Sequence, residues 1–409
     1  MASWSEVPIK DVAFFQEGPG LRNWQWTKDG IKVLNGRNVL LDGRIDLSNT
    51  DKFISWNEFR AKYRHFEIQE NDVILTSSGT IGKVGRIRAE HLPLVMNTSV
   101  IRFHSRDVVI LDDDFLFCYL RSPEFQEQIA SYAIGAAQAN FGPSHLKQMT
   151  MPLPPISVQQ KIAGTISAYD NLIENNQRRI NLLESMARAL YREWFVLRRF
   201  PGHEKMPKFR SPLGDIPRGW EVKKLGEIAE DLRRNVPKGR LEVPMPYVGL
   251  EHIPRRSLAL DAWETATELG SNKLAFKKGE VLFGKIRPYF HKVSVAPFDG
   301  LCSADTIVIR SRRPEHYATV VACVSSEDFV AEASATANGA KMPRASWGVL
   351  ENYQVVIPKG EAADKFSTLF ADTIAHQQSL IFQIQNLRRT RDLLLPRLLS
   401  GQVDLKGAM

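Results

Sequence analysis

Residues 70–75, Glu-Asn-Asp-Val-Ile-Leu, share their pattern with residues 278–283, Lys-Gly-Glu-Val-Leu-Phe, which stand 208 positions later. Each stretch combines a turn, an acidic residue and a short apolar run, which predicts a buried strand. Further matches follow in the same order: Lys83-Val84 with Lys292-Val293 after a one-residue slip, residues 98–102 with 306–310, and residues 151–154 with 355–358. The order and spacing of these matches indicate a duplicated module and not a short-period solenoid.

Each half then continues into a long stretch with helical periodicity. Apolar or small residues alternate at spacings of four and three from residue 162 to 197, and positions 366 to 398 repeat that spacing. Such spacing is typical of a coiled-coil seam. A helix of about 40 residues spans about 60 Å, more than a compact domain needs. We therefore expect two long helices that pack antiparallel along each other, the alternative being that each packs only on its own domain. The expected seam residues are Ile162, Ile166, Ile173, Ile180, Leu183, Leu190, Phe366, Phe370, Leu380, Ile384, Leu387 and Leu394.

The fold class expected from these patterns is mixed α/β, with two tandem domains and a pair of long helices. Four prolines fall between residues 201 and 217, where apolar periodicity is weak, so this stretch is interpreted as a linker. The predicted organisation is a first domain over 1–155, a central helix over 156–199, a linker over 200–219, a second domain over 220–358, and a distal helix with a tail over 359–409.

Composition excludes several classes of protein. The chain has 409 residues, of which 43% are hydrophobic and 24% charged, so it can form ordinary globular cores. Its three cysteines form no CxxC motif, which is typical of reduced thiols in the cytoplasm. No apolar run is long enough to cross a bilayer, and no export signal is recognisable, so we expect a cytoplasmic protein without membrane contact.

Motifs of catalysis were tested and mostly rejected. Residues 279–285 resemble the beginning of a P-loop, but Ile286 stands where Ser or Thr must bind Mg²⁺, and the intervening residues predict a strand. Asp215, Glu221 and Lys223 loosely fit a nuclease site, at a spacing that is common by chance. No dinucleotide fingerprint and no zinc-binding motif is present in the sequence. We therefore expect no catalytic residues, no metal site and no cofactor bound by this chain.

Clusters of basic and aromatic residues are more informative. The net charge of +8 permits a polyanionic partner without proving one. Residues 22–66 interleave Arg and Lys with Trp and Tyr, and further cations surround both repeated strands. Such side chains bind phosphates and base edges, although any one of them could simply be a solvated surface charge. The predicted DNA-binding residues are Lys83, Arg86, Arg88, Lys285, Arg287, Tyr289, Lys292, Lys341 and Arg344.

The ordered set of motifs resembles a known family, the specificity (S) subunits of type I restriction–modification enzymes. Residues 211–228, which contain Gly-Asp-Ile-Pro-Arg-Gly-Trp, are similar to the start of its second target-recognition domain. Three further similarities are the repeated strand and turn at residues 72–84 and 279–289, the start of the central helix at 152–163, and the C-terminal ending at 396–401. Residues 358–365 depart from the family pattern, because they lack the double proline and the glutamine of the first helix start.

The resemblance implies a non-catalytic subunit in which two target-recognition domains each read one half of a split, asymmetric DNA site. The two helices would set the spacer and dock two methyltransferase subunits, which carry S-adenosylmethionine. A restriction-translocase subunit, for which ATP and Mg²⁺ are expected, would bind on the outside of this complex. Two other readings stay open at this point: a coiled-coil scaffold whose α/β domains bind protein, and a standalone nuclease that uses Asp215, Glu221 and Lys223.

Overall fold

The computed structural model describes residues 4–41, 43–48, 50–133 and 141–403. The chain forms two compact units, one of residues 1–171 with 387–409 and the other of residues 172–386. The division falls within the two long helices, so each unit contains one part of both. The domain boundaries predicted at 155, 199, 219 and 358 remain predictions.

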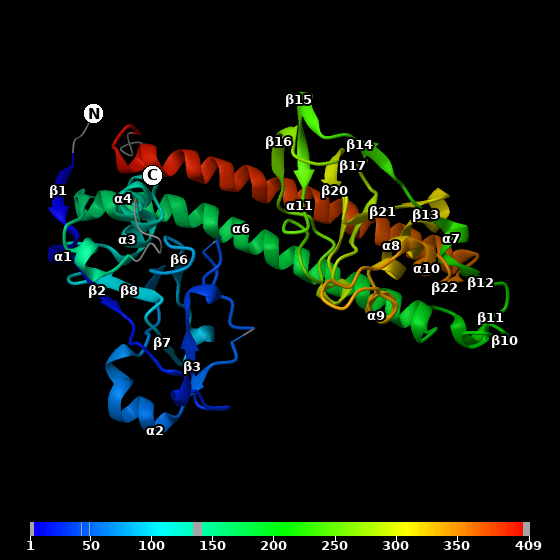
Figure 1. Ribbon diagram of the computed structural model, residues 1–409, viewed down its shortest axis with the longest axis horizontal. Helices are drawn as coiled ribbons and strands as arrows, with labels where there is room; N and C mark the ends of the chain where they lie inside the picture. Colours follow the sequence, from blue (N-terminus) through cyan, green and yellow to red (C-terminus); the bar gives the residue numbers. More distant parts are fainter. Residues whose placement is uncertain (1–3, 42, 49, 134–140, 404–409) are drawn as a thin grey trace. The chain divides into compact units, whose positions relative to one another are not determined.

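The first unit is built on an antiparallel four-stranded sheet in the order β2-β8-β5-β6 (Figure 1). A smaller sheet, β4-β3-β7, pairs β3 and β7 in parallel, and β1 pairs with β9 in a separate two-stranded ribbon. The strands are β1 (Ser5–Pro8), β2 (Ala13–Glu17), β3 (Ile31–Leu34), β4 (Phe53–Ile54), β5 (Val73–Thr76), β6 (Val84–Arg86), β7 (Leu94–Met96), β8 (Val100–Ser105) and β9 (Thr150–Leu153). The helices of this domain are α1 (Ile9–Val12), α2 (Trp56–Glu58), α3 (Asp113–Leu120), α4 (Pro123–Ala133) and α5 (Pro143–Leu146).

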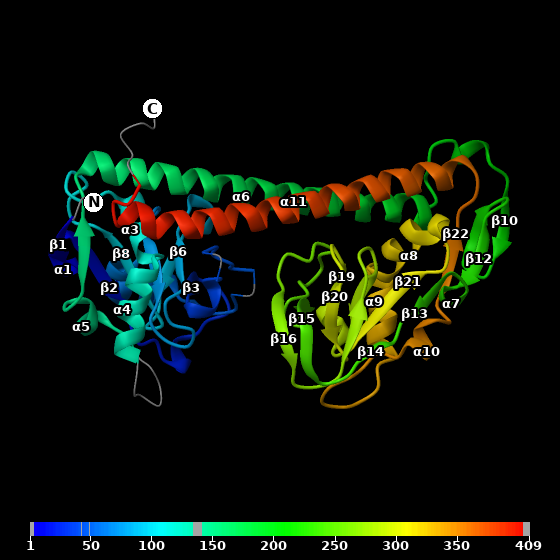
Figure 2. The same cartoon turned by 90° about the horizontal axis from the view of Figure 1, so that it is seen from above.

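The second unit repeats this plan with the sheet β13-β21-β18-β19 (Figure 2). A second sheet has five strands in the order β14-β17-β20-β15-β16, and β12 pairs with β22 in a ribbon. The strands are β12 (Glu221–Lys224), β13 (Ala229–Asp231), β14 (Arg234–Val236), β15 (Gly239–Val248), β16 (Glu264–Leu269), β17 (Lys273–Phe276), β18 (Val281–Gly284), β19 (Val293–Val295), β20 (Gly300–Ser303), β21 (Thr306–Ser311) and β22 (Gln354–Ile357). The helices are α7 (Leu225–Ile228), α8 (Tyr317–Val324), α9 (Glu327–Ala335) and α10 (Trp347–Leu350).

The duplication predicted from the sequence is confirmed strand by strand. The repeated apolar runs form β5 and β18, the matching residues 98–102 and 306–310 lead into or form β8 and β21, and residues 151–154 and 355–358 form most of β9 and β22. The two main sheets have equivalent strand orders. One helix start repeats as well, because Ser122 caps α4 through Phe125 N–H and Ser326 caps α9 through Phe329 N–H. The two domains therefore share one architecture.

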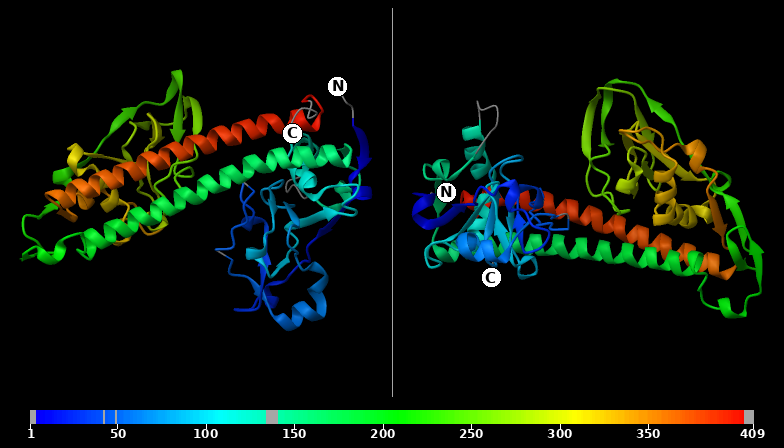
Figure 3. Two further views of the ribbon diagram at one scale, coloured as in Figure 1. Left: turned by 180° about the vertical axis from the view of Figure 1, so that it is seen from behind. Right: turned by 60° about the horizontal axis from the view of Figure 1, so that its bottom comes forward.

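Two long helices complete the fold, α6 (Ile156–Tyr191) and α11 (Glu361–Leu399), and they lie side by side in both views of Figure 3. In the first unit Asp170 of α6 contacts Arg391 of α11 at 2.6 Å. In the second unit Asn176 donates to Gln383 at 3.2 Å, and Phe366 packs on Phe195, which follows α6. Early residues of one helix meet late residues of the other, so the predicted antiparallel packing is confirmed.

The predicted seam coincides with buried positions for most of its length. Ile162, Ile166, Ile180, Phe366, Phe370, Leu380 and Ile384 are buried, while Ile173, Leu183, Leu190, Leu387 and Leu394 are half-buried. Ile374, Ile381 and Leu395 are also buried, although they lie outside the heptad positions. They belong to hydrophobic clusters shared with the domains, so each helix packs both on its partner and on a domain. The two arrangements that the sequence left open therefore coexist.

The segment predicted as a linker contains regular structure. Strands β10 (Lys208–Ser211) and β11 (Gly214–Pro217) form a hairpin after a π-helical turn over Arg192–Val196. Phe200 stacks on Trp220 at a centroid distance of 4.9 Å, and Phe195 packs on the same indole. These aromatic rings join the end of α6 to the beginning of the second domain, which fixes that connection by apolar packing.

Candidate nucleic-acid interface

In the second domain, two loops are hydrogen-bonded into one cationic surface. The turn that follows β18 and the loop over 336–346 are joined by Arg287 N–H to the Pro343 carbonyl at 2.8 Å and Ala345 N–H to the Lys285 carbonyl at 2.9 Å. Five of the predicted DNA-binding residues therefore come together here, although they are separated by up to 59 positions in the sequence. These residues, which we call the second-domain cationic surface, are Lys285, Arg287, Tyr289, Lys341 and Arg344.

The side chains of this surface are largely available to a ligand. Tyr289 is 54% exposed, and Lys341 and Arg344 are exposed. Arg344 makes a 3.5 Å ion pair with half-exposed Asp305, which is a weak, screened contact at a surface. Arg287 has a positive φ of 47°, and its guanidinium contacts the Lys341 carbonyl at 3.5 Å. Such strained backbone conformations in non-glycine residues concentrate at functional sites.

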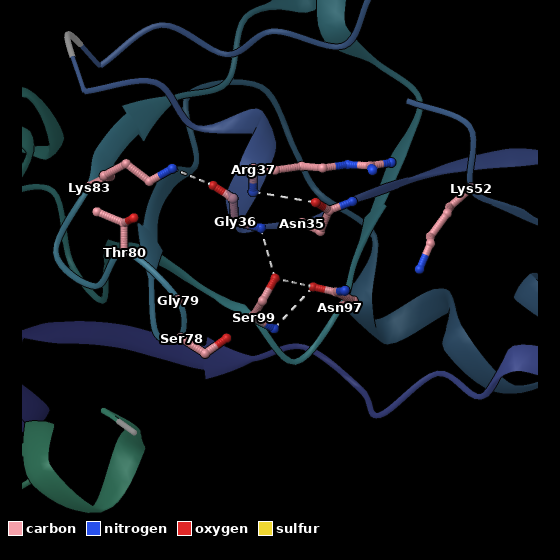
Figure 4. Close-up of a pocket in the computed structure, with 10 residues that line it drawn as sticks. All are labelled: Asn35, Gly36, Arg37, Lys52, Ser78, Gly79, Thr80, Lys83, Asn97 and Ser99. Carbon is pink, nitrogen blue, oxygen red and sulfur yellow. Dashed lines mark hydrogen bonds between the residues drawn. The ribbon is translucent and has the colours of Figure 1, made fainter. Parts of the chain in front are cut away.

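The first domain has a polar hollow of about 420 Å³ beside the turn that follows β5, the strand equivalent to β18 (Figure 4). It is lined by Asn35, Gly36, Arg37, Lys52, Ser78, Gly79, Thr80, Lys83, Asn97 and Ser99. Arg37 and Lys52 supply positive charge, whereas the amides and hydroxyls supply hydrogen-bonding groups suited to phosphates and base edges. Arg37 belongs to the basic region that the sequence pattern indicates over residues 22–66, whereas the asparagines and serines are not recognisable there, because isolated polar residues carry no distinctive pattern.

Three predicted DNA-binding residues have internal partners. Lys83 donates its ammonium to the carbonyls of Gly36 and Val39 at 2.6 and 2.5 Å, and Lys292 donates to the Leu250 carbonyl. Arg86 pairs with Asp114 and lies over the Phe117 ring. Burial lowers the pKa of both lysines. Arg88 is exposed at the turn after β6. The geometry of Lys83, Arg86 and Lys292 therefore favours roles within the fold.

The residues of the alternative nuclease reading lie at the start of the second domain. Glu221 of β12 is ion-paired with Lys223 at 3.4 Å and with Lys359, while Asp215 is exposed on the hairpin strand β11. Within the described ranges, no three His, Cys, Asp or Glu side chains gather as ligands for a metal ion. None of the helices in those ranges combines the length and apolar composition needed to span a bilayer.

Comparisons with known proteins agree with this architecture. The family model described as "Type I restriction modification DNA specificity domain" matches residues 1–185. The chain is 26% identical over 351 residues to the type I restriction enzyme MjaIX specificity subunit of Methanocaldococcus jannaschii, covering 82% of this chain and 78% of that protein. It is 24% identical to the type I restriction enzyme EcoDI specificity subunit of Escherichia coli, over 69% of each. The crystal structure of the S subunit of a type I restriction–modification system from M. genitalium covers 97% of this chain and 96% of its own, with 19% identity and a TM-score of 0.57, which is a likeness of fold.

The chain thus combines duplicated α/β domains and paired antiparallel helices with polar and cationic surfaces. Residues 1–185 match the DNA specificity domain of type I restriction–modification systems, and over most of its length the chain is similar to specificity subunits of such systems.

Proposed function

We propose that this chain is the specificity subunit of a type I restriction–modification system, and that each of its domains reads one half of a bipartite, asymmetric site in double-stranded DNA. The observation that carries the proposal is the repetition of one recognition frame with different side chains. The turns after β5 and β18 occupy equivalent places in the two domains, next to the polar hollow in one and the cationic surface in the other. Cations there would bind phosphates, and polar tips would read base edges. Two related but unlike surfaces suit two unlike half-sites.

The direct DNA contacts would come from the accessible residues of both domains. In the second domain these are Lys285, Arg287, Tyr289, Lys341 and Arg344, and in the first they are Arg37, Lys52 and Arg88. Arg and Lys pair with the acceptors of guanine in the major groove, and asparagine pairs with adenine. The hollow that contains Asn35 and Asn97 is therefore suited to base contacts in addition to phosphate contacts.

The two long helices would set the spacer and bind the methyltransferase subunits. Both helices carry large apolar side chains that are at least half exposed, namely Leu172, Leu182 and Met186 on α6 and Leu369 and Leu393 on α11. Exposed apolar groups of this size on otherwise polar helices mark protein-binding surfaces. In the complete complex, S-adenosylmethionine would be bound by the two methyltransferase subunits, and ATP and Mg²⁺ by a restriction-translocase subunit.

The experiment is to co-express the chain with a type I methyltransferase subunit from the same genome, in a host that lacks type I systems, and to sequence the host methylome. We expect adenine methylation at one split motif with a constant spacer, absent when this chain is omitted. Binding of the purified complex to that motif should weaken steeply as salt rises. Methylation without a motif, or no dependence on this chain, would favour the reading of a protein-binding scaffold.

A further inference from the structure

A lysine directly before an edge strand supports a capped turn in each domain. Lys83 precedes β6 and Lys292 precedes β19, and their carbonyls accept equivalent hydrogen bonds of 2.9 Å from Thr76 N–H and Gly284 N–H. Both side chains extend to a turn that follows another strand: Lys83 to the Gly36 and Val39 carbonyls after β3, and Lys292 to the Leu250 carbonyl after β15. Strands β3 and β15 are equivalent, because each pairs in parallel with one neighbour, β7 or β20.

The two turns have the same internal hydrogen bonds. In the first domain Asn35 N–H donates to the Asn38 side chain at 3.0 Å, and Asn38 N–H donates back to the Asn35 carbonyl at 2.9 Å. In the second domain Gly249 N–H donates to His252 Nδ1 at 2.9 Å, and His252 N–H returns to the Gly249 carbonyl at 3.1 Å. One capped turn, held by one lysine, is therefore built twice from different residues.

The third residue of the turn, whose side chain takes no part in these hydrogen bonds, is Arg37 in the first domain and Glu251 in the second. Arg37 borders the polar hollow and pairs with exposed Asp51, a contact that a ligand can displace at little cost (Figure 4). Glu251 is exposed. Arginine donates to guanine, whereas a carboxylate accepts from the amino group of cytosine. The same frame therefore presents opposite hydrogen-bonding chemistry in the two domains.

We propose that Lys83 and Lys292 are positioning residues that hold these turns, and that the turns, through Arg37 and Glu251, set the base preference of their half-sites. This inference rests on the proposed function. Each ammonium is already bonded to carbonyls within the fold, so neither lysine supplies a phosphate contact. Removal of the ammonium would free the turn, and the DNA-binding side chain that it carries would lose its fixed direction.

The test uses Lys83→Met and Lys292→Met in the complex with the methyltransferase. Binding is measured to duplexes that carry the motif from the methylome, and to duplexes with single-base changes in each half. The measured quantity is the ratio of affinities for the motif and for a duplex with one base changed. We expect this ratio to fall about tenfold for changes in the first half-site in Lys83→Met, and for changes in the second half-site in Lys292→Met. The salt slope should stay unchanged, and each variant serves as the control for the other. Lys83→Gln, which keeps an N–H donor without the charge, should retain part of the discrimination.

A phosphate contact would give a different result. Each lysine variant would then lower the salt slope by about 0.9 and weaken binding to all duplexes equally, and that result would overturn the inference while leaving the proposed function intact. If the methionine variants fail to fold, Arg37→Glu and Glu251→Arg decide, because both side chains lie at the surface. A changed base preference in the corresponding half-site supports the inference, and an unchanged preference overturns it. A wild-type complex without any motif would contradict the proposed function itself.

Discussion

At the scale of single residues, Arg287 offers a test of DNA contact in one half-site. Its guanidinium lies beside the exposed loop that carries Lys341, within the second-domain cationic surface. We expect Arg287→Ala to weaken binding of the complex by about 1–3 kcal/mol, with the loss confined to sequences of the second half-site. The measurement is the dissociation constant on duplexes altered in one half at a time.

The matched control for Arg287 is Arg313→Ala in the same domain. Arg313 follows the end of β21. The beginning of β21 is next to the cationic surface, because Thr306 there pairs with Gly284, so Arg313 lies at the opposite end of this strand. Arg313 is also strongly exposed and pairs only loosely with Glu315. The control should bind DNA like the wild type, and equal losses at both half-sites in Arg287→Ala would contradict the model of two independent readers.

Asp170 carries a second prediction at this scale, which concerns stability. It accepts from Arg121 at 2.6 Å and from Arg391 at 2.6 Å, so it joins the first domain, α6 and α11 within the first unit. Burial alone would raise the pKa of Asp170, but the hydrogen bond and the charges of the two arginines outweigh burial and lower it. A carboxyl group whose pKa is lowered by folding stabilises the folded state above its unfolded pKa of about 3.9.

Replacement of Asp170 by Asn should therefore lower the free energy of unfolding by about 2 kcal/mol at neutral pH, because two partly buried guanidinium groups lose their counter-charge. The difference from the wild type should shrink as the pH falls below about 4, through the pKa of folded Asp170. Chemical unfolding across that pH range measures both effects. Asp392→Asn, at an exposed neighbour of Arg391, should change stability by less than about 0.5 kcal/mol.

At the scale of elements, Glu184 connects α6 to the second domain. Its buried carboxylate accepts hydrogen bonds from Leu258 N–H at 2.7 Å and Ala259 N–H at 3.1 Å, and from the Ser257 hydroxyl. Glu184→Ala would leave these buried backbone donors without partners, at a cost of about 2–4 kcal/mol. Thermal unfolding of the full chain should show the loss. The control is Glu174→Ala, at a glutamate of the same helix that is more exposed than Glu184, and it should leave the midpoint of thermal unfolding nearly unchanged.

Regular elements were the part of the fold that sequence patterns could predict. The strands β5, β18, β8 and β21 and the two long helices follow from local periodicity, which is visible in a short window. The hairpin β10–β11 was missed, because four prolines and weak apolar alternation are typical of a linker. The stretch is ordered instead by aromatic packing of Phe200 on Trp220, a contact that local patterns do not reveal.

The candidate site was predicted less completely, for a related reason. The sequence located the basic residues near the repeated strands, but it could not separate those that face solvent from those that are internally bonded. Lys83 reaches its carbonyl partners across 47 and 44 positions, and Lys292 across 42. In the sequence these lysines look like any exposed cation, and only tertiary contacts distinguish a positioning residue from a DNA contact.

At the scale of the whole molecule, the prediction concerns the spacer. We expect one heptad inserted after Asn171 and another after Asn386 to lengthen both helices equally, while the contacts within each compact unit stay intact. Seven helical residues add about 10.5 Å, or about three base pairs of DNA. Methylome sequencing should show a motif with the same half-sites and a longer spacer, or no motif if the half-sites lose their phasing. An unchanged spacer would argue strongly against a measuring role of the helices.

The ribbons β1–β9 and β12–β22 have a consequence for how such a chain can evolve. In each ribbon the strand that opens a domain pairs with the strand that closes it, Val7 opposite Met151 in one and Val222 opposite Val356 in the other. The two ends of each domain therefore lie next to each other. A single gene-recombination event that exchanges the segment between the paired strands would replace one recognition domain without changing the path of the flanking backbone. Under the proposed function, such an event would change one half-site of the DNA target and leave the other half-site as it was.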